Sequence, residues 1–154
     1  LTQAFGGLGA TVLHSGELDA GLKQMIAFAV SNVAGCRYCQ AHTANSAQKN
    51  SVSSEKIKAV FEFESSTFFS DQEKAALRVA VHAGMVPNAV EAEHMSELSR
   101  YFSEKQVIEV VAVISLFGFL NRWNDTMATT LESAPKNFAA DQLASHGWAA
   151  GKHE

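Results

Sequence analysis

A chain of 154 residues, of which 47% are apolar, has the length and composition of one domain with a single buried core. Its formal charge is −4 and it has no basic tract or stripe, which argues against binding to a nucleic-acid backbone. The first residues lack a basic region before a long apolar run, and no segment reaches the roughly 18 uninterrupted apolar residues of a membrane span. We therefore expect a cytoplasmic protein without membrane contact.

Apolar residues recur at intervals of three and four through most of the chain, which predicts an all-α fold. The first predicted helix covers residues 19–33, where one apolar stripe ends at Ala34 and Gly35. A second helix is predicted over residues 37–49, directly after that glycine, and a shorter one follows Ser53.

Two capping boxes mark the starts of later helices. The sequence SDQE at residues 70–73 predicts a helix that ends near Gly84, and an amphipathic segment after it runs to Tyr101. The sequence SEKQ at residues 103–106 opens the longest helix. Residues 107–120 are apolar on every side and exceed a usual strand in length, so we expect a central buried helix there.

A weak internal repeat is visible when the chain is shifted by 85 positions. The shift aligns Gln24 with Glu109, and CRYC at residues 36–39 with NRWN at residues 121–124. This predicts two similar helix pairs packed about a pseudo-twofold axis, of which only one carries thiols. No linker separates the halves, so we expect a single domain over residues 1–154.

Both cysteines of the chain lie in GCRYCQAH, at the start of the second predicted helix. Free amides and the positive end of the dipole at a helix N-terminus stabilise a thiolate by up to about 2 kcal/mol. The spacing lets Cys36 meet Cys39, and Cys39 meet His42, on adjacent stripes of the helix. Because an imidazole takes and returns a proton near neutral pH, the motif predicts a redox-active thiol pair with a proton carrier.

The alternatives to a redox pair are weaker, although two stay open. A zinc site on Cys36, Cys39 and His42 needs a fourth ligand, and the remaining histidines lie outside any second paired motif. Two inert buried thiols are the second open alternative. A structural disulfide would close so small a loop that it removes little chain entropy, and Gln40 after the second cysteine excludes haem attachment.

Four stretches of the chain resemble the AhpD-like branch of the carboxymuconolactone decarboxylase family: AVSNVAGCRYCQAHT, FFSDQEKAALRVA, EVVAVISLFGFLNRWNDTM and GWAAGKH. The resemblance implies an all-helical AhpD-like fold, a homo-oligomer, and alkylhydroperoxidase chemistry without a metal or bound cofactor. It also implies that Cys39 attacks a hydroperoxide, Cys36 resolves the sulfenic acid and His42 carries the proton. An external dithiol, a lipoyl group or a thioredoxin-like protein, would then reduce the disulfide.

The chain departs from the family pattern around the thiols. Well-studied members place a histidine four residues after the second cysteine, whereas His42 follows Cys39 by three. Gln24 replaces their glutamate upstream of the first cysteine, and Tyr38 replaces a second histidine between the cysteines. We therefore expect Gln24 and Tyr38 beside the thiols, in an incomplete proton relay with slower peroxidase turnover.

Several polar residues elsewhere are candidates to complete the relay. Glu17, Glu73 and Glu109 are the carboxylates considered; Glu73 is explained by its capping box and Glu109 by the start of the long helix, so we favour structural roles for these two. Asn121 and Asp125, in the thiol-free repeat, are expected to tie helices together.

Three functions compete for this sequence. The first is an oxidoreductase that reduces hydroperoxides or exchanges disulfides through the thiol pair. The second is a non-redox enzyme like the lactone decarboxylases, in which a carboxylate or histidine transfers the proton and the cysteines are bystanders. The third is an interaction protein that senses redox state without turnover.

Overall fold

The computed structural model describes all residues 1–154, and its regular elements are all helical, as predicted. The α-helices are α1 (Thr2–His14), α2 (Ala20–Ala34), α3 (Arg37–Lys49), α4 (Ser54–Lys58), α5 (Asp71–Gly84), α6 (Ala92–Tyr101), α7 (Glu104–Met127) and α8 (Ser133–Gln142). Three short 3₁₀ helices complete the fold: η1 (Ala59–Glu62), η2 (Ala144–His146) and η3 (Gly151–His153).

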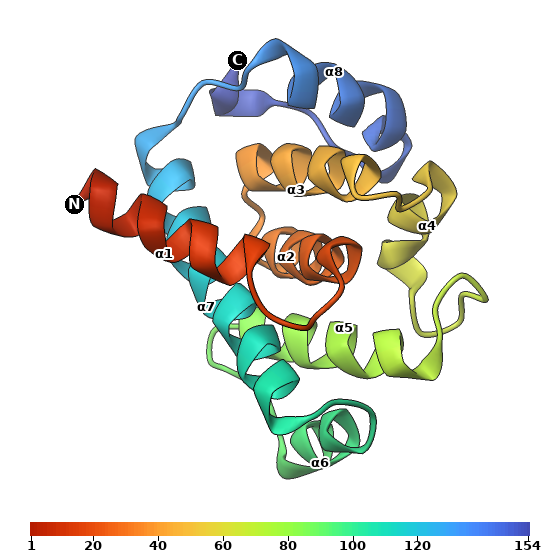
Figure 1. The fold of residues 1–154 in the computed structure, drawn as a ribbon. Coiled ribbons are helices and arrows are strands. Elements are labelled where there is room, and N and C mark those ends of the chain that lie inside the picture. The colour runs from red at the N-terminus through yellow and green to blue at the C-terminus, as the bar shows by residue number, and fades with distance from the viewer.

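Helix α2 occupies the centre of the molecule, between α3 and α5 (Figure 1). Its first turn is capped by the Asp19 carboxylate, which accepts a hydrogen bond of 2.8 Å from the Leu22 amide. The helix ends at Gly35, whose φ of 74° lies in the left-handed region that glycine adopts without strain. This turn folds α3 back against α2 and sets Cys36 at the start of α3.

The capping boxes predicted from the sequence are both present. The Ser70 hydroxyl accepts from the Glu73 amide while the Glu73 carboxylate accepts from the Ser70 amide, and Ser103 and Gln106 make the same exchange. These local signals therefore start α5 and α7 where the sequence indicates.

Helix α7 differs from the expectation for residues 107–120. The segment is helical, as predicted, but it is not buried on every side, since Ile108 is 68% exposed and Phe119 is 43% exposed. By length and composition alone, α7 is apolar enough to cross a membrane. It nevertheless packs against α1, α2, α3, α5 and α6, as a core helix of a helical domain does.

Helices α1 and α8 are absent from the elements expected from the sequence. Helix α1 contains three glycines, which are poor helix formers, and it buries no residue fully. Helix α8 carries Pro135 in its first turn, where proline is tolerated, and packs on α3. The chain after α8 is held against α3 by the Trp148 indole, whose Nε1 donates to the Arg37 carbonyl at 3.2 Å. Both helices border the site described next.

Candidate active site

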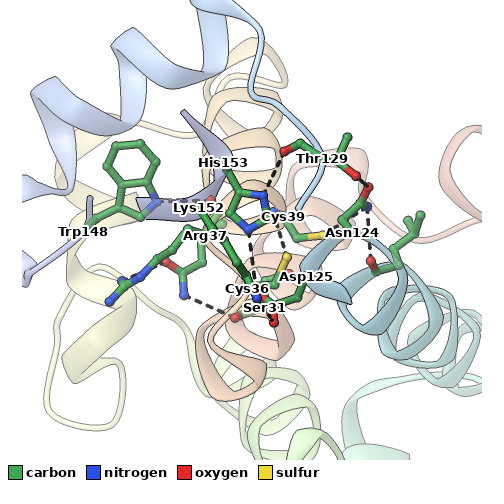
Figure 2. A network of polar contacts seen from close by, with 12 residues as sticks. Ser31, Cys36, Arg37, Cys39, Asn124, Asp125, Thr129, Trp148, Lys152 and His153 are labelled. Atoms are coloured by element: carbon green, nitrogen blue, oxygen red, sulfur yellow. Dashed lines mark hydrogen bonds and ion pairs between the residues drawn. The ribbon is translucent and has the colours of Figure 1, made fainter. Parts of the chain in front are cut away.

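The two cysteines meet at the N-terminus of α3, as the spacing predicts. Cys36 is the N-cap residue, and its Sγ accepts a hydrogen bond of 3.4 Å from the Cys39 amide (Figure 2). Both cysteines are free thiols and both are buried, with exposed fractions of 0% for Cys36 and 3% for Cys39. The first turn of the helix therefore holds the two sulfur atoms close together.

The two sulfurs differ in acidity because one thiol donates a hydrogen bond to the other. A hydrogen bond donated by the Cys39 thiol lowers the pKa of Cys36 to about 7, with further help from the amides of Cys39 and Tyr38, and against the effects of burial and of the Asp125 charge. The same hydrogen bond, together with burial, raises the pKa of Cys39. Negative charge therefore resides first on Cys36, and Cys39 keeps its proton.

Cys39 is the less acidic of the two thiols, but it is the one that a molecule in the adjacent cavity can reach. Cys39 lines a cavity of about 580 Å³ between α1, α2, α3 and α7, whereas Cys36 is absent from its walls. The lining is largely apolar and aromatic, with Phe5, Phe117, Phe119, Leu120 and Trp123 among its members. A small apolar molecule in this cavity therefore meets Cys39 before Cys36.

The remaining predicted site residues also face this cavity. His42, Tyr38 and Gln24 all line it, together with Cys39. The His42 ring lies against the Tyr38 ring, with centroids 4.4 Å apart. The structure thus brings four of the five predicted site residues to one cavity wall, with Cys36 directly behind Cys39.

A carboxylate supports His42, although it is none of the three considered from the sequence. His42 Nε2 lies 2.7 Å from Glu132 Oε2, and the Tyr38 hydroxyl donates to Glu132 Oε1 at 3.3 Å. Hydrogen bonding from its own amide and from His42 keeps the pKa of Glu132 below the usual range, against the effect of burial. Burial and the Glu132 charge raise the pKa of Tyr38 to about 12, so Tyr38 remains a hydrogen-bond donor. Glu132 lies 90 positions from His42, and no local pattern in the sequence marks it.

The three glutamates weighed from the sequence have different partners. Glu73 belongs to its capping box and pairs with Lys56. Glu109 pairs with the buried Lys23 at 2.9 Å and accepts hydrogen bonds from the amides of residues 17 and 18. Glu17 lies 3.6 Å from the exposed Lys105. The capping role expected for Glu73 is confirmed. Glu109 also has a structural role, but it ties α7 to Lys23 and the segment before α2 and does not lie in the first turn of α7.

Asn124 contacts the thiol pair from α7, a role that was not expected from the sequence. Its Nδ2 donates to Cys39 Sγ at 3.7 Å and to the Leu120 carbonyl at 3.1 Å, while its Oδ1 accepts from Thr129 Oγ1 at 2.9 Å. Asn124 is also the residue that the 85-position shift aligns with Cys39. That alignment is the one signal in the sequence that could have indicated this contact.

A second group of polar side chains lies behind Cys36. The Cys36 sulfur, an Asp125 carboxylate oxygen and a His153 ring nitrogen all lie within 4.8 Å of one another. Asp125 bonds Lys152 at 2.8 Å, an interaction that lowers the pKa of its carboxyl. As expected, Asp125 ties α7 to another segment, here the C-terminal one. Asn121 is buried, and neither atom of its amide has a hydrogen-bond partner.

Comparisons with known proteins agree with this architecture. Residues 1–82 match the sequence model of the carboxymuconolactone decarboxylase family. The uncharacterized protein YnjA of Escherichia coli is 27% identical over 110 residues, which are 71% of this chain and only 60% of YnjA. The chain thus spans less than two thirds of that relative.

Solved structures extend the likeness to most of the chain. The debrominase Bmp8, as a Cys-to-Ala variant in complex with 2,3,4-tribromopyrrole, has a TM-score of 0.86 and 38% identity, covering 92% of this chain and 75% of Bmp8. An Agrobacterium tumefaciens protein of unknown function, linked by its name to the antioxidant defence protein AhpD, has a TM-score of 0.80 at 18% identity. That alignment covers 85% of this chain and 90% of the Agrobacterium protein. The chain therefore belongs to the carboxymuconolactone decarboxylase family and has its all-helical AhpD-like fold.

Proposed function

We propose that this protein is a dithiol-dependent reductase that passes two electrons from Cys36 and Cys39 to a small apolar substrate, with organic hydroperoxides as the first candidate. One observation carries the proposal. Cys39 lies in the wall of an apolar cavity while Cys36, directly behind it, is the more acidic thiol. Two inert thiols in a dry core would have neither an adjacent cavity nor a thiolate stabilised near neutral pH.

The first half of the reaction takes place at Cys39. The Cys39 thiol gives its proton to His42, and the sulfur attacks the terminal oxygen of the hydroperoxide. The O–O bond breaks with its electron pair on the alkoxide, which takes the proton back from His42 and leaves as an alcohol. Cys39 is then a sulfenic acid.

The second half releases water and oxidises the pair. The Cys36 thiolate attacks the Cys39 sulfur, the S–O bond breaks, and hydroxide leaves as water after taking up a proton. Each turnover therefore converts one hydroperoxide and two thiols into an alcohol, a water molecule and a disulfide. We propose that an external dithiol, a lipoyl group or a thioredoxin-like protein, reduces the disulfide, and that the chain works as a homo-oligomer.

Reductive dehalogenation is a second candidate for the same dithiol. Bmp8 is a debrominase, and its Cys-to-Ala variant binds a tribrominated pyrrole. The aromatic lining of the cavity here suits a flat halogenated ring. In this reaction one sulfur takes the halogen, the carbon takes a proton, and the second sulfur displaces halide as the disulfide forms. Electrons balance as before, with two thiols oxidised for each carbon–halogen bond reduced.

The experiment that tests the proposal measures thiols and products together. Reduced protein is mixed with cumene hydroperoxide or, in parallel, with a polybrominated pyrrole, and free thiols, cumyl alcohol and bromide are quantified. We expect two thiols to disappear for each product molecule formed, and the Cys36→Ser, Cys39→Ser double variant to form none.

Different outcomes separate the competing functions. If both thiols survive both substrates, the reductase proposal is wrong. Lactone decarboxylation that persists in the double variant would favour the non-redox enzyme. A change of oligomeric state on oxidation, without product formation, would favour the redox-sensing interaction protein.

A further inference from the structure

His153 has a buried ring nitrogen that lacks a hydrogen-bond partner. The residue is 1% exposed, and its Nε2 makes no hydrogen bond. Its second nitrogen, Nδ1, lies 2.8 Å from the Thr129 carbonyl, which can only accept. Nδ1 must therefore carry a proton, and Nε2 is left as the nitrogen that can gain or lose one.

The free nitrogen lies among the groups behind Cys36. The nearest Asp125 oxygen is 3.6 Å from His153 Nε2, and Cys36 Sγ belongs to the same cluster, within 4.8 Å. Figure 2 shows the His153 ring above Cys36 and Asp125, on the side of the thiols nearest the C-terminal segment. The cavity that Cys39 lines includes none of these three residues.

The ring is also held firmly in place. The Leu131 amide donates to the His153 carbonyl at 2.9 Å, and Lys152, its neighbour, bonds the Asp125 carboxylate. The 3₁₀ turn η3 is thereby fastened to α7 and to the segment before α8. A buried imidazole with one nitrogen bound to a carbonyl and the second facing a thiol and a carboxylate has the arrangement that activates a nucleophilic cysteine.

We propose that His153 is the proton acceptor of Cys36, and that Asp125 is the positioning residue that stabilises the imidazolium formed there. The inference rests on the proposed dithiol function and deepens it. The S–H bond of Cys36 breaks, its proton passes to Nε2 of His153, and the electron pair stays on sulfur as the thiolate that later attacks Cys39. The proton returns when hydroxide leaves Cys39 as water, so no external oxidant or reductant enters this step.

Each sulfur then has its own histidine. His42 serves Cys39 on the cavity side, and His153 serves Cys36 on the buried side. The two thiols lose their protons at different moments of the cycle, Cys39 when it attacks the substrate and Cys36 when it attacks Cys39, and two separate acceptors keep these transfers apart.

A metal ion accounts less well for the same cluster. The three side chains offer one sulfur, one nitrogen and one oxygen ligand, one fewer than a closed tetrahedral zinc site uses.

The test compares the acidity of Cys36 with and without the acceptor. In a Cys39→Ser background the rate of Cys36 alkylation by iodoacetamide is followed against pH, so that only one thiol reacts. The titratable or charged groups that face the pair from neighbouring elements are Cys39, Tyr38, Asp125 and Lys152. The serine hydroxyl preserves the donor that Cys39 supplies to Cys36.

His153→Asn is the informative variant, because the asparagine amide replaces Nδ1 and its bond to Thr129 but has no counterpart of Nε2. We expect alkylation of Cys36 at pH 7 to slow by about fivefold, the effect of a one-unit rise from a thiol pKa of about 7, with no change at high pH. His146→Asn, at an exposed histidine stacked on Phe61, is the matched control and should leave the profile unchanged. An unchanged profile in folded His153→Asn protein overturns the proposal.

A measurement on the unaltered protein decides the matter if the variant does not fold. The ¹⁵N chemical shift of His153 Nε2 is followed by NMR while thiolate formation is followed by ultraviolet absorbance. An Nε2 that carries a proton at the pH values where Cys36 is a thiolate supports the assignment, and an Nε2 without a proton in that range overturns it. Neither readout requires turnover, so a protein inactive toward hydroperoxides and brominated pyrroles would refute the proposed function without bearing on His153.

Discussion

The two sides of the thiol pair use the same kinds of side chain in opposite surroundings. On the cavity side His42 and Glu132 lie 2.7 Å apart with side chains 37% and 62% exposed. On the buried side the His153 side chain is 1% exposed and lies 3.6 Å from Asp125, whose side chain is 42% exposed. The His42 imidazole can exchange protons with substrate and water, whereas the His153 imidazole is shielded from both and lies beside the Cys36 thiol. The two cysteines, three residues apart, are therefore prepared for different steps.

Replacing the sulfurs one at a time should change activity most. Cys39→Ser should lower hydroperoxide turnover at least about 10³-fold, because the sulfur that meets the substrate is lost. Cys36→Ser should instead consume one hydroperoxide per chain and stop as a sulfenic acid, detected by dimedone labelling and mass spectrometry. A Cys39→Ser variant that still reduces hydroperoxide through Cys36 would reverse the proposed roles.

A smaller loss should follow changes to the acid–base groups on the cavity side. His42→Asn should lower turnover about 10²-fold, as expected for loss of a general acid–base group, whereas Glu132→Gln should cost about tenfold since it only supports the imidazole. Steady-state kinetics with cumene hydroperoxide measures both. Glu154→Gln, at an exposed carboxylate that bonds Lys136, is the control for lost surface charge. Equal losses in the Glu132 and Glu154 variants would remove Glu132 from the site.

The two thiols should also differ in their pH dependence. Because hydrogen bonding lowers the pKa of Cys36 to about 7, its thiolate fraction, and hence its alkylation rate, should rise about tenfold from pH 6 to pH 8 and then level off. The raised pKa of Cys39 predicts that its alkylation starts only at higher pH. Peptide mass spectrometry after brief alkylation of the reduced protein reports both sites at once. A lower midpoint pH for alkylation of Cys39 than for alkylation of Cys36 would contradict the order of acidity.

The weakest perturbation is a change in the cavity wall. Phe119 stacks on Phe5 with ring centroids 4.4 Å apart, so Phe119→Ala removes part of an aromatic wall. Loss of about 1 kcal/mol of aromatic contact should raise the KM for cumene hydroperoxide several-fold, with kcat unchanged and hydrogen peroxide unaffected. Phe61→Ala is the matched control, since Phe61 is 41% exposed and lies outside the cavity. A rise in KM for hydrogen peroxide as well would show damage beyond substrate contact.

The parts of the site that the sequence predicts correctly are those that depend on neighbours along the chain. Cys36 caps α3 and Cys39 lies in its first turn because Gly35 ends α2, and each of these signals acts within a few residues. The positions of Tyr38 and Gln24 at the cavity also agree with the expectation. The capping boxes of α5 and α7 are local in the same way.

The parts that escaped prediction depend on which distant helices pack together. Glu132 reaches His42 and His153 reaches Cys36 because α8 and the C-terminal turn fold over α3. No local pattern marks Glu132, and the family-like stretch GWAAGKH did not indicate a role for His153. The burial of α7 was overestimated for a related reason, since an all-round apolar sequence does not say which faces find a partner.

The amino-acid sequence alone determines most of the helices, their caps and the pairing of the two thiols at one helix N-terminus. It can do so because backbone hydrogen bonds and side-chain spacing within a helix act over only a few residues. Long-range packing was needed to bring Cys39 to a cavity, Glu132 to His42 and His153 behind Cys36. The contact of Glu132 with His42 and that of His153 with Cys36 join residues about 90 to 120 positions apart. They form because α2, α3, α7 and α8 bury their apolar faces against one another, which brings the polar residues near the helix ends together.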